Sequence, residues 1–485
     1  MSLGVRGKFV IGFDGVEHRI IRDGVVVVEG KRIKYVGKGY EGKVDRWIDA
    51  PTGLVMPGLI NTHIHAASAP KDKGFIDDTG ARHFYMSSLG ENLTALGQAM
   101  RGPDYEVFAK FSLAECLKSG NTTIVEISMV PNLGAEKAVK TIDQLGIRAT
   151  ESPIVADGVW DRTPVADLRT KWLGLEAGLK KLDEAEKFAK TYAGACGGRL
   201  IPAIYGDTVD KCSADLQRAI RAKTNELKVP VTIHAGQWVV EFNNMIRMYG
   251  RTPVEFLKDT GLLGPDLIIG HGWAITGHPM VNYPPVDGGD LAILAKSGAT
   301  VSHDPLVFIK RGNKMHSHTA YLKAGINVSI GTDTVPQDLL NEMRMASYTS
   351  KLADWDCHSG TSRDIFNSAT LGGAKGLGRS DLGRLAPGAL ADIAVVNMET
   401  FNGVPYRDPI KNLINSCQRA DVKWVIVDGK VVVEDGKLTT IDERTLLRDV
   451  QKAGEEIWAR IPEHHYLKQM ADEISPLAFK LWDGK

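Results

Sequence analysis

The chain has 485 residues, 43% of them hydrophobic and 24% charged, a composition typical of globular proteins. Its 59 basic and 59 acidic side chains cancel, so no excess of positive charge is present to attract nucleic acid or an anionic membrane surface. The N-terminus lacks a signal-peptide pattern, no 18-residue apolar run occurs and the five scattered cysteines form no C-x-x-C, which together predict a cytoplasmic protein without disulfides or a membrane span.

The first 50 residues and a late part of the chain share one sequence pattern, in which short runs of β-branched residues are separated by glycines and charged residues. The first example is "GVVVVEGKRIKYVGKG" (24–39), and the later ones are "GALADIAVVNMETF" (388–401) and "VKWVIVDGKVVVEDGKL" (422–438). Asp428–Gly429 between two valine-rich runs predicts a hairpin. β-rich segments at opposite ends of a chain make one core only by packing together, so we predict a small composite β-sandwich.

Between these segments, short apolar runs alternate with amphipathic helical stretches. Eight runs are predicted as strands: Leu59–Thr62, Thr122–Ile127, Arg148–Pro153, Leu200–Ile204, Val231–His234, Leu267–Gly270, Thr300–His303 and Asn327–Gly331. Eight strand–helix units favour an α/β fold with a TIM-like (β/α)8 barrel, and a doubly wound open sheet is the alternative. The predicted parts are 1–57 and 381–440 for the sandwich, 58–380 for the barrel and 441–485 for a helical tail.

Residues able to bind a metal stand where the predicted strands end. These residues are His63, His65, His234, His271, His303 and Asp333. In a parallel barrel the C-terminal strand ends meet at one rim, which carries the active site. Residues i and i+2 of an extended segment point the same way, so His63 and His65 can project together. Imidazoles and a carboxylate suit a divalent transition metal that keeps one position for water.

The segments "PGLINTHIH", "IHAGQ", "IIGHG" and "GTD", in this order, resemble the amidohydrolase superfamily. The resemblance covers nearly the whole chain. The segments 249–265, 388–396 and 425–438 are similar to the branch of chlorohydrolases and aminohydrolases that act on triazines, pterins and nucleobases.

This resemblance implies a role for each matching residue. His63, His65, His234 and Asp333 match the ligands of a single ion, zinc or else iron. His271 matches the histidine that hydrogen-bonds the attacking water or the developing oxyanion, and Asp333 would also accept the proton of the water. Two-metal members carry a carboxylated lysine at the end of strand four, whereas "RLIPAIYGDTV" (199–209) has none, so one metal is expected.

Position 237 departs from the pattern of the deaminating relatives. They place a proton-shuttling glutamate three residues after the strand-five histidine, where this chain has Gln237. An amide does not transfer that proton at neutral pH. Glu241, one helical turn further, is the candidate substitute, and the alternative is a solvated carboxylate on a helix surface.

Two loops are expected to shape the substrate pocket. They are residues 66–104, which contain Phe84, and residues 272–289, which contain Trp273. We predict that these aromatic rings contact a flat heterocycle, although packing on the barrel rim fits each of them equally well. His303 is either a substrate contact or a structural hydrogen-bonding residue.

The sequence therefore predicts a metal-dependent hydrolase of carbon–nitrogen bonds other than peptide bonds. Metal-activated water would attack a ring carbon of a nitrogen heterocycle and expel an amine or another leaving group. The alternatives are hydrolysis of a cyclic amide and a non-catalytic scaffold. The expected partner is a small heterocyclic substrate, with no nucleic acid and no membrane, and the resemblance implies a homodimer.

Overall fold

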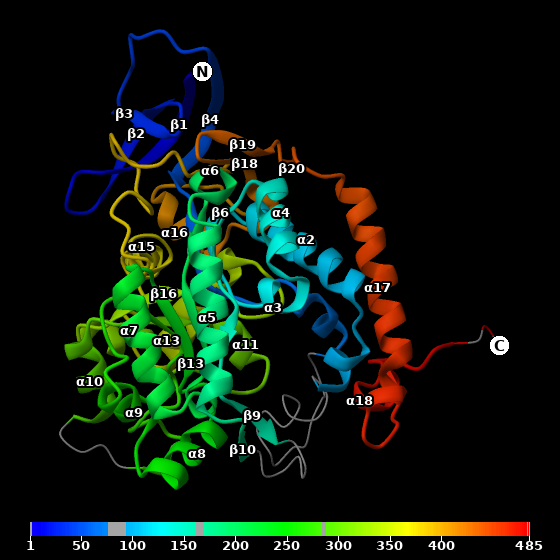
Figure 1. The fold of residues 1–485 in the computed structure, drawn as a ribbon. Coiled ribbons are helices and arrows are strands. Elements are labelled where there is room, and N and C mark those ends of the chain that lie inside the picture. The colour runs from blue at the N-terminus through cyan, green and yellow to red at the C-terminus, as the bar shows by residue number, and fades with distance from the viewer. Residues whose placement is uncertain (1, 76–93, 162–168, 284–287, 483, 485) are drawn as a thin grey trace.

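The computed structural model describes residues 2–75, 94–161, 169–283, 288–482 and 484 as a barrel with a β-sheet domain at one end (Figure 1). The barrel strands are β5 (Leu59–Ile64), β6 (Asn121–Glu126), β7 (Arg148–Glu151), β8 (Ile154–Val155), β11 (Leu200–Pro202), β12 (Ile204–Thr208), β13 (Val231–Ala235), β14 (Leu267–His271), β15 (Thr300–His303) and β16 (Asn327–Ile330). All pairs among them are parallel. The predicted barrel is therefore confirmed.

Two of the eight predicted strands are interrupted. The third consists of β7 and β8, with Pro153 between them, and the fourth consists of β11, which ends at Pro202, and β12. Proline has no N–H to donate to a strand ladder, which explains both interruptions. β11 pairs with β7 and β12 pairs with β8, so the third and fourth strands lie side by side and the sheet closes.

Helices surround the barrel, which leaves both faces of its strands buried, as a parallel sheet requires. They are α2 (Gly102–Lys118), α3 (Met129–Leu133), α4 (Ala135–Leu145), α5 (Leu175–Thr191), α6 (Ala195–Gly198), α7 (Ala214–Leu227), α8 (Val239–Tyr249), α9 (Pro253–Asp259), α10 (Gly289–Ser297), α11 (Pro305–Ile309), α12 (His318–Lys323), α13 (Leu339–Asp354), α14 (Ser362–Asn367), α15 (Gly373–Gly376) and α16 (Pro409–Asn415). A π-helix, η3 (Ser368–Gly372), lies between α14 and α15. Within the described parts of the chain, no helix is both long and apolar enough to span a bilayer.

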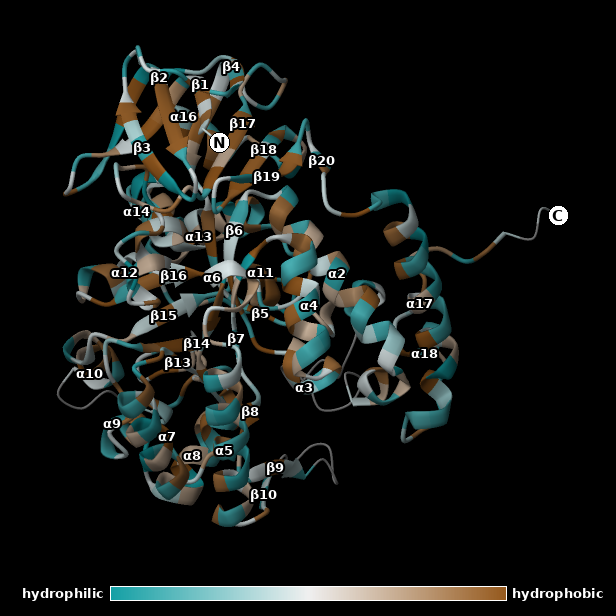
Figure 2. Cartoon of the chain, turned by 45° about the horizontal axis from the view of Figure 1, so that its top comes forward, coloured by the Kyte–Doolittle hydropathy of each residue, from teal (hydrophilic) through white to brown (hydrophobic). Residues whose placement is uncertain are grey.

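Both ends of the chain contribute to the sheet domain. Its strands are β1 (Ser2–Phe13), β2 (His18–Glu29), β3 (Arg32–Gly37), β4 (Arg46–Pro57), β17 (Ile393–Asn397), β18 (Val422–Val427), β19 (Lys430–Glu434) and β20 (Lys437–Leu438). They form one eight-stranded sheet in the order β20-β19-β18-β17-β4-β1-β2-β3. The composite domain is confirmed, and Figure 2 shows the concentration of hydrophobic residues along β1, β2, β17 and β18.

The sheet domain encloses its own core because its edge strand returns to the chain segment that enters β17. Ile33 of β3 donates its N–H to the Ala389 carbonyl, and Lys31 accepts from the N–H of Ala391. The enclosed cluster includes Val5, Val28 and Ile393. The predicted hairpin is present between β18 and β19, where Asp428 and Gly429 both have a positive φ, as a two-residue type I′ turn needs.

A buried ionic cluster joins the sheet domain to the barrel. Arg148, at the start of β7, lies 3.1 Å from Asp392 and 2.9 Å from Asp428, and all three side chains are almost fully buried. Asp392 also accepts the Asp428 N–H through its carboxylate and the Gly58 N–H through its carbonyl. This one aspartate thus contacts the barrel, the hairpin and the residue that connects β4 to β5.

The C-terminal part forms α17 (Glu443–His464) and α18 (Ala471–Ile474), and α17 lies along the side of α2 (Figure 1). Arg460 on α17 donates to the carbonyl of Ala99 and lies 2.9 Å from Asp104. Trp458 donates its indole N–H to the Lys71 carbonyl. The C-terminal helix therefore holds two stretches of the loop that follows β5.

Substituting Met for Arg148 leaves the Asp392 and Asp428 carboxylates buried without that cation, which we expect to cost about 3–5 kcal/mol of the free energy of unfolding. Burial by itself raises the pKa of Asp428, but the Arg148 hydrogen bond and the Arg148 and Lys31 charges lower it overall. This stabilisation is therefore present at neutral pH and is lost as the pH falls below about 4, the pKa of an unfolded aspartate.

Urea denaturation at pH 7 and at acid pH measures this difference. Arg251→Met, which breaks the exposed ion pair with Asp259, is the control and should cost about 0–1 kcal/mol. Equal losses for the two variants at pH 7 would contradict the role of the buried cluster.

Candidate metal centre and active site

Main-chain hydrogen bonds between the first and last barrel strands set the position of three predicted ligands. The Asp333 N–H donates to the His63 carbonyl at 2.9 Å, and the His65 N–H donates to the Asp333 carbonyl at 2.8 Å. Asp333 has a φ of 55°, a left-handed conformation that non-glycine residues seldom adopt. This conformation persists because hydrogen bonds on both sides of the residue hold it.

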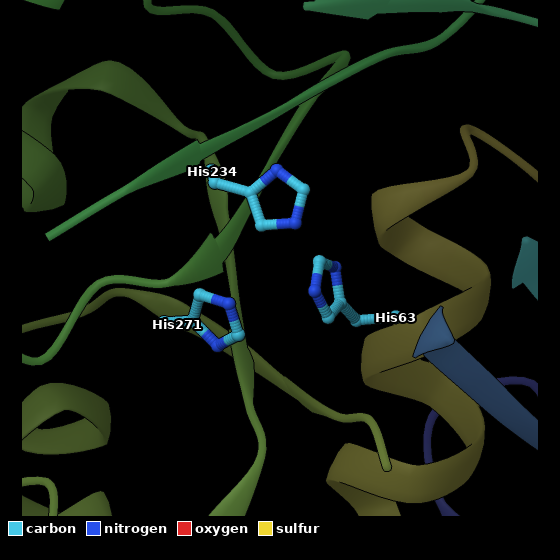
Figure 3. A group of neighbouring side chains, drawn as sticks. All are labelled: His63, His234 and His271. Carbon is cyan, nitrogen blue, oxygen red and sulfur yellow. The ribbon is translucent and has the colours of Figure 1, made fainter. Parts of the chain in front are cut away.

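The side chains of these residues meet those of the fifth and sixth strands at the barrel mouth. His63, from β5, points toward His234 of β13 and His271 of β14 (Figure 3). The ring centre of His63 lies 4.8 Å from that of His234 and 4.6 Å from that of His271. Asp333 Oδ1 lies 3.4 Å from His65 Nε2 and 3.8 Å from His63 Nε2. The structure thus brings the predicted ligands together.

These residues fit a divalent metal. Among the described residues, the buried His63 ring has no hydrogen-bond partner for either nitrogen, although burying an unpaired polar atom is costly. The Nε2 atoms of His65 and His234 face one another at 3.3 Å. Burial and the neighbouring imidazoles lower the pKa of His63 well below its ordinary value, which keeps the ring neutral and able to act as a ligand. Three imidazoles and one carboxylate form a donor set that zinc accepts.

His234 is oriented by a contact outside this group. Its Nδ1 lies 2.5 Å from the carbonyl oxygen of Asp207. A carbonyl only accepts, so Nδ1 carries the proton and Nε2 has its lone pair free for a metal.

His271 lies next to a carboxylate that the sequence analysis did not single out. Asp304 Oδ2 is 2.9 Å from His271 Nδ1, and both side chains are fully buried. Ser302 donates to the other oxygen of Asp304, and a side chain on Gly331 would collide with that same oxygen. The alternation of a strand could have identified Asp304, because Ser302 and Asp304 share one face and His303 has the other.

His303 accordingly points away from the metal ligands. Its Nδ1 lies 3.0 Å from Nδ1 of His318 on α12, and His318 Nε2 lies 3.0 Å from Ser368 Oγ in the π-helix. These contacts agree with the structural interpretation of His303. Trp273 is 1% exposed and packs against Phe308 and His278 in the hydrophobic core. Phe84 lies outside the described residues.

Gln237 and Glu241 occupy different environments. Gln237 lines the cavity beside the metal ligands, and its Oε1 has no partner among the described residues. Glu241 is fully buried, so it is not the solvated surface carboxylate considered above. Its oxygens accept the main-chain N–H groups of Gly236 and Gln237 at 2.7 and 3.2 Å. Burial raises the pKa of Glu241 well above its ordinary value.

A cavity of about 330 Å³ opens beside the candidate ligands. His65, His234, Gln237 and Asp333 contribute to its lining. Met100, Tyr105 and Trp160 supply apolar and aromatic surface, and charged side chains supply much of the rest. Of the two predicted loops, the one after β5 contributes to this lining, whereas the described part of the loop 272–289 does not.

The family model described as the amidohydrolase family matches residues 54–432. The chain belongs to this family. The predicted resemblance is thus confirmed, and so is the prediction of a hydrolase that acts on carbon–nitrogen bonds other than peptide bonds.

Deaminases and a chlorohydrolase are among the proteins that this amidohydrolase resembles. A 5'-deoxyadenosine deaminase of Methanosarcina barkeri is 28% identical over 463 residues, covering 94% of this chain and 98% of that protein. An adenosine deaminase from Xanthomonas campestris with bound zinc has a TM-score of 0.80 at 20% identity, covering 94% of this chain and 98% of its own. The zinc complex of an atrazine chlorohydrolase from Arthrobacter aurescens has a TM-score of 0.78 at 23% identity, covering 93% of this chain and all of its own (100%). The similarity to these last two structures shows a shared fold and nothing about the reaction.

Proposed function

We propose that this amidohydrolase uses one divalent metal ion, zinc or else iron, to add water to an electrophilic ring carbon of a nitrogen heterocycle and expel an amine or another leaving group. The observation that carries the proposal is the meeting of His63, His65, His234 and Asp333 beside one cavity, which the last three of them line. A bound divalent ion would lower the pKa of a water molecule to about 7 and so make it a nucleophile at neutral pH. Aromatic surface from Tyr105 and Trp160 suits a flat ring.

The residues around the ligand group divide the remaining tasks. Asp333 is at once near the ligand nitrogens and in the cavity lining, so we assign it to accept the proton of the attacking water. We assign His271 to hold the water or the developing oxyanion by a hydrogen bond. Asp304, at 2.9 Å from His271 Nδ1, orients the His271 ring.

Gln237 and Glu241 are proposed to position the substrate rather than to move a proton. The Gln237 amide lines the cavity and can hydrogen-bond a ring nitrogen, but it does not transfer a proton at neutral pH. Glu241 holds the turn that carries Gln237 through the two main-chain N–H groups. A site of this kind favours leaving groups that need little protonation, such as a halide or an activated amide nitrogen. Hydrolysis of a cyclic amide is the second candidate for the same reason.

We also propose a cytoplasmic location and a homodimer. The five cysteines are all free, which supports a reducing compartment. The C-terminal segment leaves Leu477, Phe479, Leu481 and Trp482 more than half exposed, which supports contact with another chain.

A panel of aminated heterocycles, chlorinated triazines, cyclic ureas and lactams tests the proposed reaction with the zinc-loaded protein. We expect turnover of at least one panel member. With that substrate, Asp333→Asn should lower kcat by about 10²–10⁴-fold while the ion is retained, because an amide binds a metal but does not accept the proton. Normal turnover by a metal-loaded Asp333→Asn variant would show that another residue is the base, and no turnover across the panel would contradict the proposed reaction.

Gln237→Ala and Glu241→Gln test the assignment of the two neighbouring residues. Each should raise KM by a few-fold to about tenfold, as expected for the loss of a neutral hydrogen bond, and leave kcat and the pH–rate profile nearly unchanged. If Glu241 shuttles a proton instead, Glu241→Gln will lower kcat by about 10²-fold and remove one limb of the profile. Gln237→Glu is the complementary variant, which should gain activity on rings whose leaving group is an unactivated amine.

A further inference from the structure

The cavity beside the metal ligands carries more charge than a heterocyclic ring requires. Its described lining includes three cationic side chains and three carboxylates: Lys71, Lys211, Arg311, Asp72, Asp207 and Asp333. Lys71, Asp72 and Asp333 are buried, and the other three side chains are partly exposed. A charge drawn away from water normally has a partner of opposite sign, because desolvation makes an unpaired charge costly. The ion pairs among these six side chains therefore show which of them remains unpaired and able to bind a charged group of the substrate.

Both lysines are paired within the protein. Lys71 Nζ lies 3.0 Å from Asp72 Oδ1 and donates to the Ser68 carbonyl at 2.7 Å. Lys211 Nζ lies 2.6 Å from Asp207 Oδ2 and 4.3 Å from the ring centre of Trp160. These carboxylates neutralise the lysines.

Arg311 has no such partner in the part of the chain that the structure describes. It follows α11, and its Nη1 donates to the main-chain carbonyl of Val307 at 2.7 Å. Among the described residues, no carboxylate lies within ion-pair distance of its guanidinium. Asp333, which shares the cavity, belongs to the ligand group at the metal centre. Since a guanidinium has five N–H donors, most of its hydrogen-bonding capacity remains available to a bound molecule.

We propose that the heterocyclic substrate carries an anionic substituent, a carboxylate or a phosphate, and that Arg311 binds it. Arginine recognises both groups through paired, charge-assisted hydrogen bonds. Met100, Tyr105 and Trp160 line the same cavity and provide a surface for the ring. The proposal rests on the proposed function, because it names the class of substrate that the same cavity admits.

Calorimetric binding to the zinc-loaded protein tests this inference without requiring turnover. The probes form two matched sets: adenosine, adenosine 5'-carboxylic acid and adenosine 5'-monophosphate, and pterin and pterin-6-carboxylate. In at least one set, we expect the anionic compound to bind about tenfold to 100-fold more tightly than its neutral counterpart, as charged hydrogen bonds contribute. The adenosine arms distinguish a carboxylate site from a phosphate site.

Substitutions test whether Arg311 is the source of the preference for anionic probes. Arg311→Gln should remove the preference for the anionic probe and leave binding of the neutral probe within a few-fold, whereas Arg311→Lys should keep part of it. Arg218→Gln removes the same charge from an exposed ion pair on α7 and should keep the whole preference. Added salt should reduce the preference in the native protein, because screening weakens exposed ionic contacts.

Anionic probes that bind no better than the neutral ones would overturn the inference, and so would a preference that survives in Arg311→Gln. This failure is separable from failure of the proposed function. Turnover of neutral heterocycles without any anion preference would leave the hydrolase intact and exclude the role of Arg311. Anion preference without turnover would leave the role of Arg311 intact and contradict the proposed reaction.

Discussion

The seam between the first and last barrel strands is the constraint on which the site depends. Asp333 and His63 are 270 positions apart in the sequence, yet the two main-chain hydrogen bonds between residues 63–65 and Asp333 place their side chains around one point. The regular ladder between β5 and β16 consists of a single pair, Ile330 with Asn61. The hydrogen bonds that close the barrel at this seam therefore also fix the positions of His63, His65 and Asp333. A change that opens this seam moves three of the four candidate ligands relative to His234.

The sheet domain holds the first barrel strand at its N-terminal end. Asp392 accepts the N–H of Gly58, the residue directly before β5, and its carboxylate is held by Arg148 of the third strand. These contacts bring the segment that enters β17 close to the start of the first barrel strand. At the opposite rim, α17 holds the loop after β5 through the Lys71 carbonyl and through Ala99. Two C-terminal segments, the one around Asp392 and α17, therefore hold the chain before and after β5.

Much of the fold and of the metal centre could be predicted from the sequence, because strand periodicity and the rule that parallel strands end at one rim are local and general. The prediction was weaker for residues whose role depends on which face of a strand they occupy. His303 and Asp304 are adjacent in the sequence, but Asp304 contacts His271, whereas His303 contacts His318 on α12. Burial of Trp273, the inward turn of Glu241 and the isolation of Arg311 depend on tertiary contacts that no short motif encodes. Asp428–Gly429 shows the opposite case, in which turn chemistry alone predicts the hairpin.

The most direct measurement is anomalous X-ray diffraction at the zinc edge on crystals of the zinc-loaded protein, combined with elemental analysis. The account predicts one ion per chain, bound by His63 and His65 from the first strand, His234 from the fifth and Asp333 from the eighth, at about 2.0–2.2 Å. A second tightly bound ion would contradict the single-metal assignment. An ion bound elsewhere, or no ion at the meeting point of these four side chains, would contradict the account as a whole.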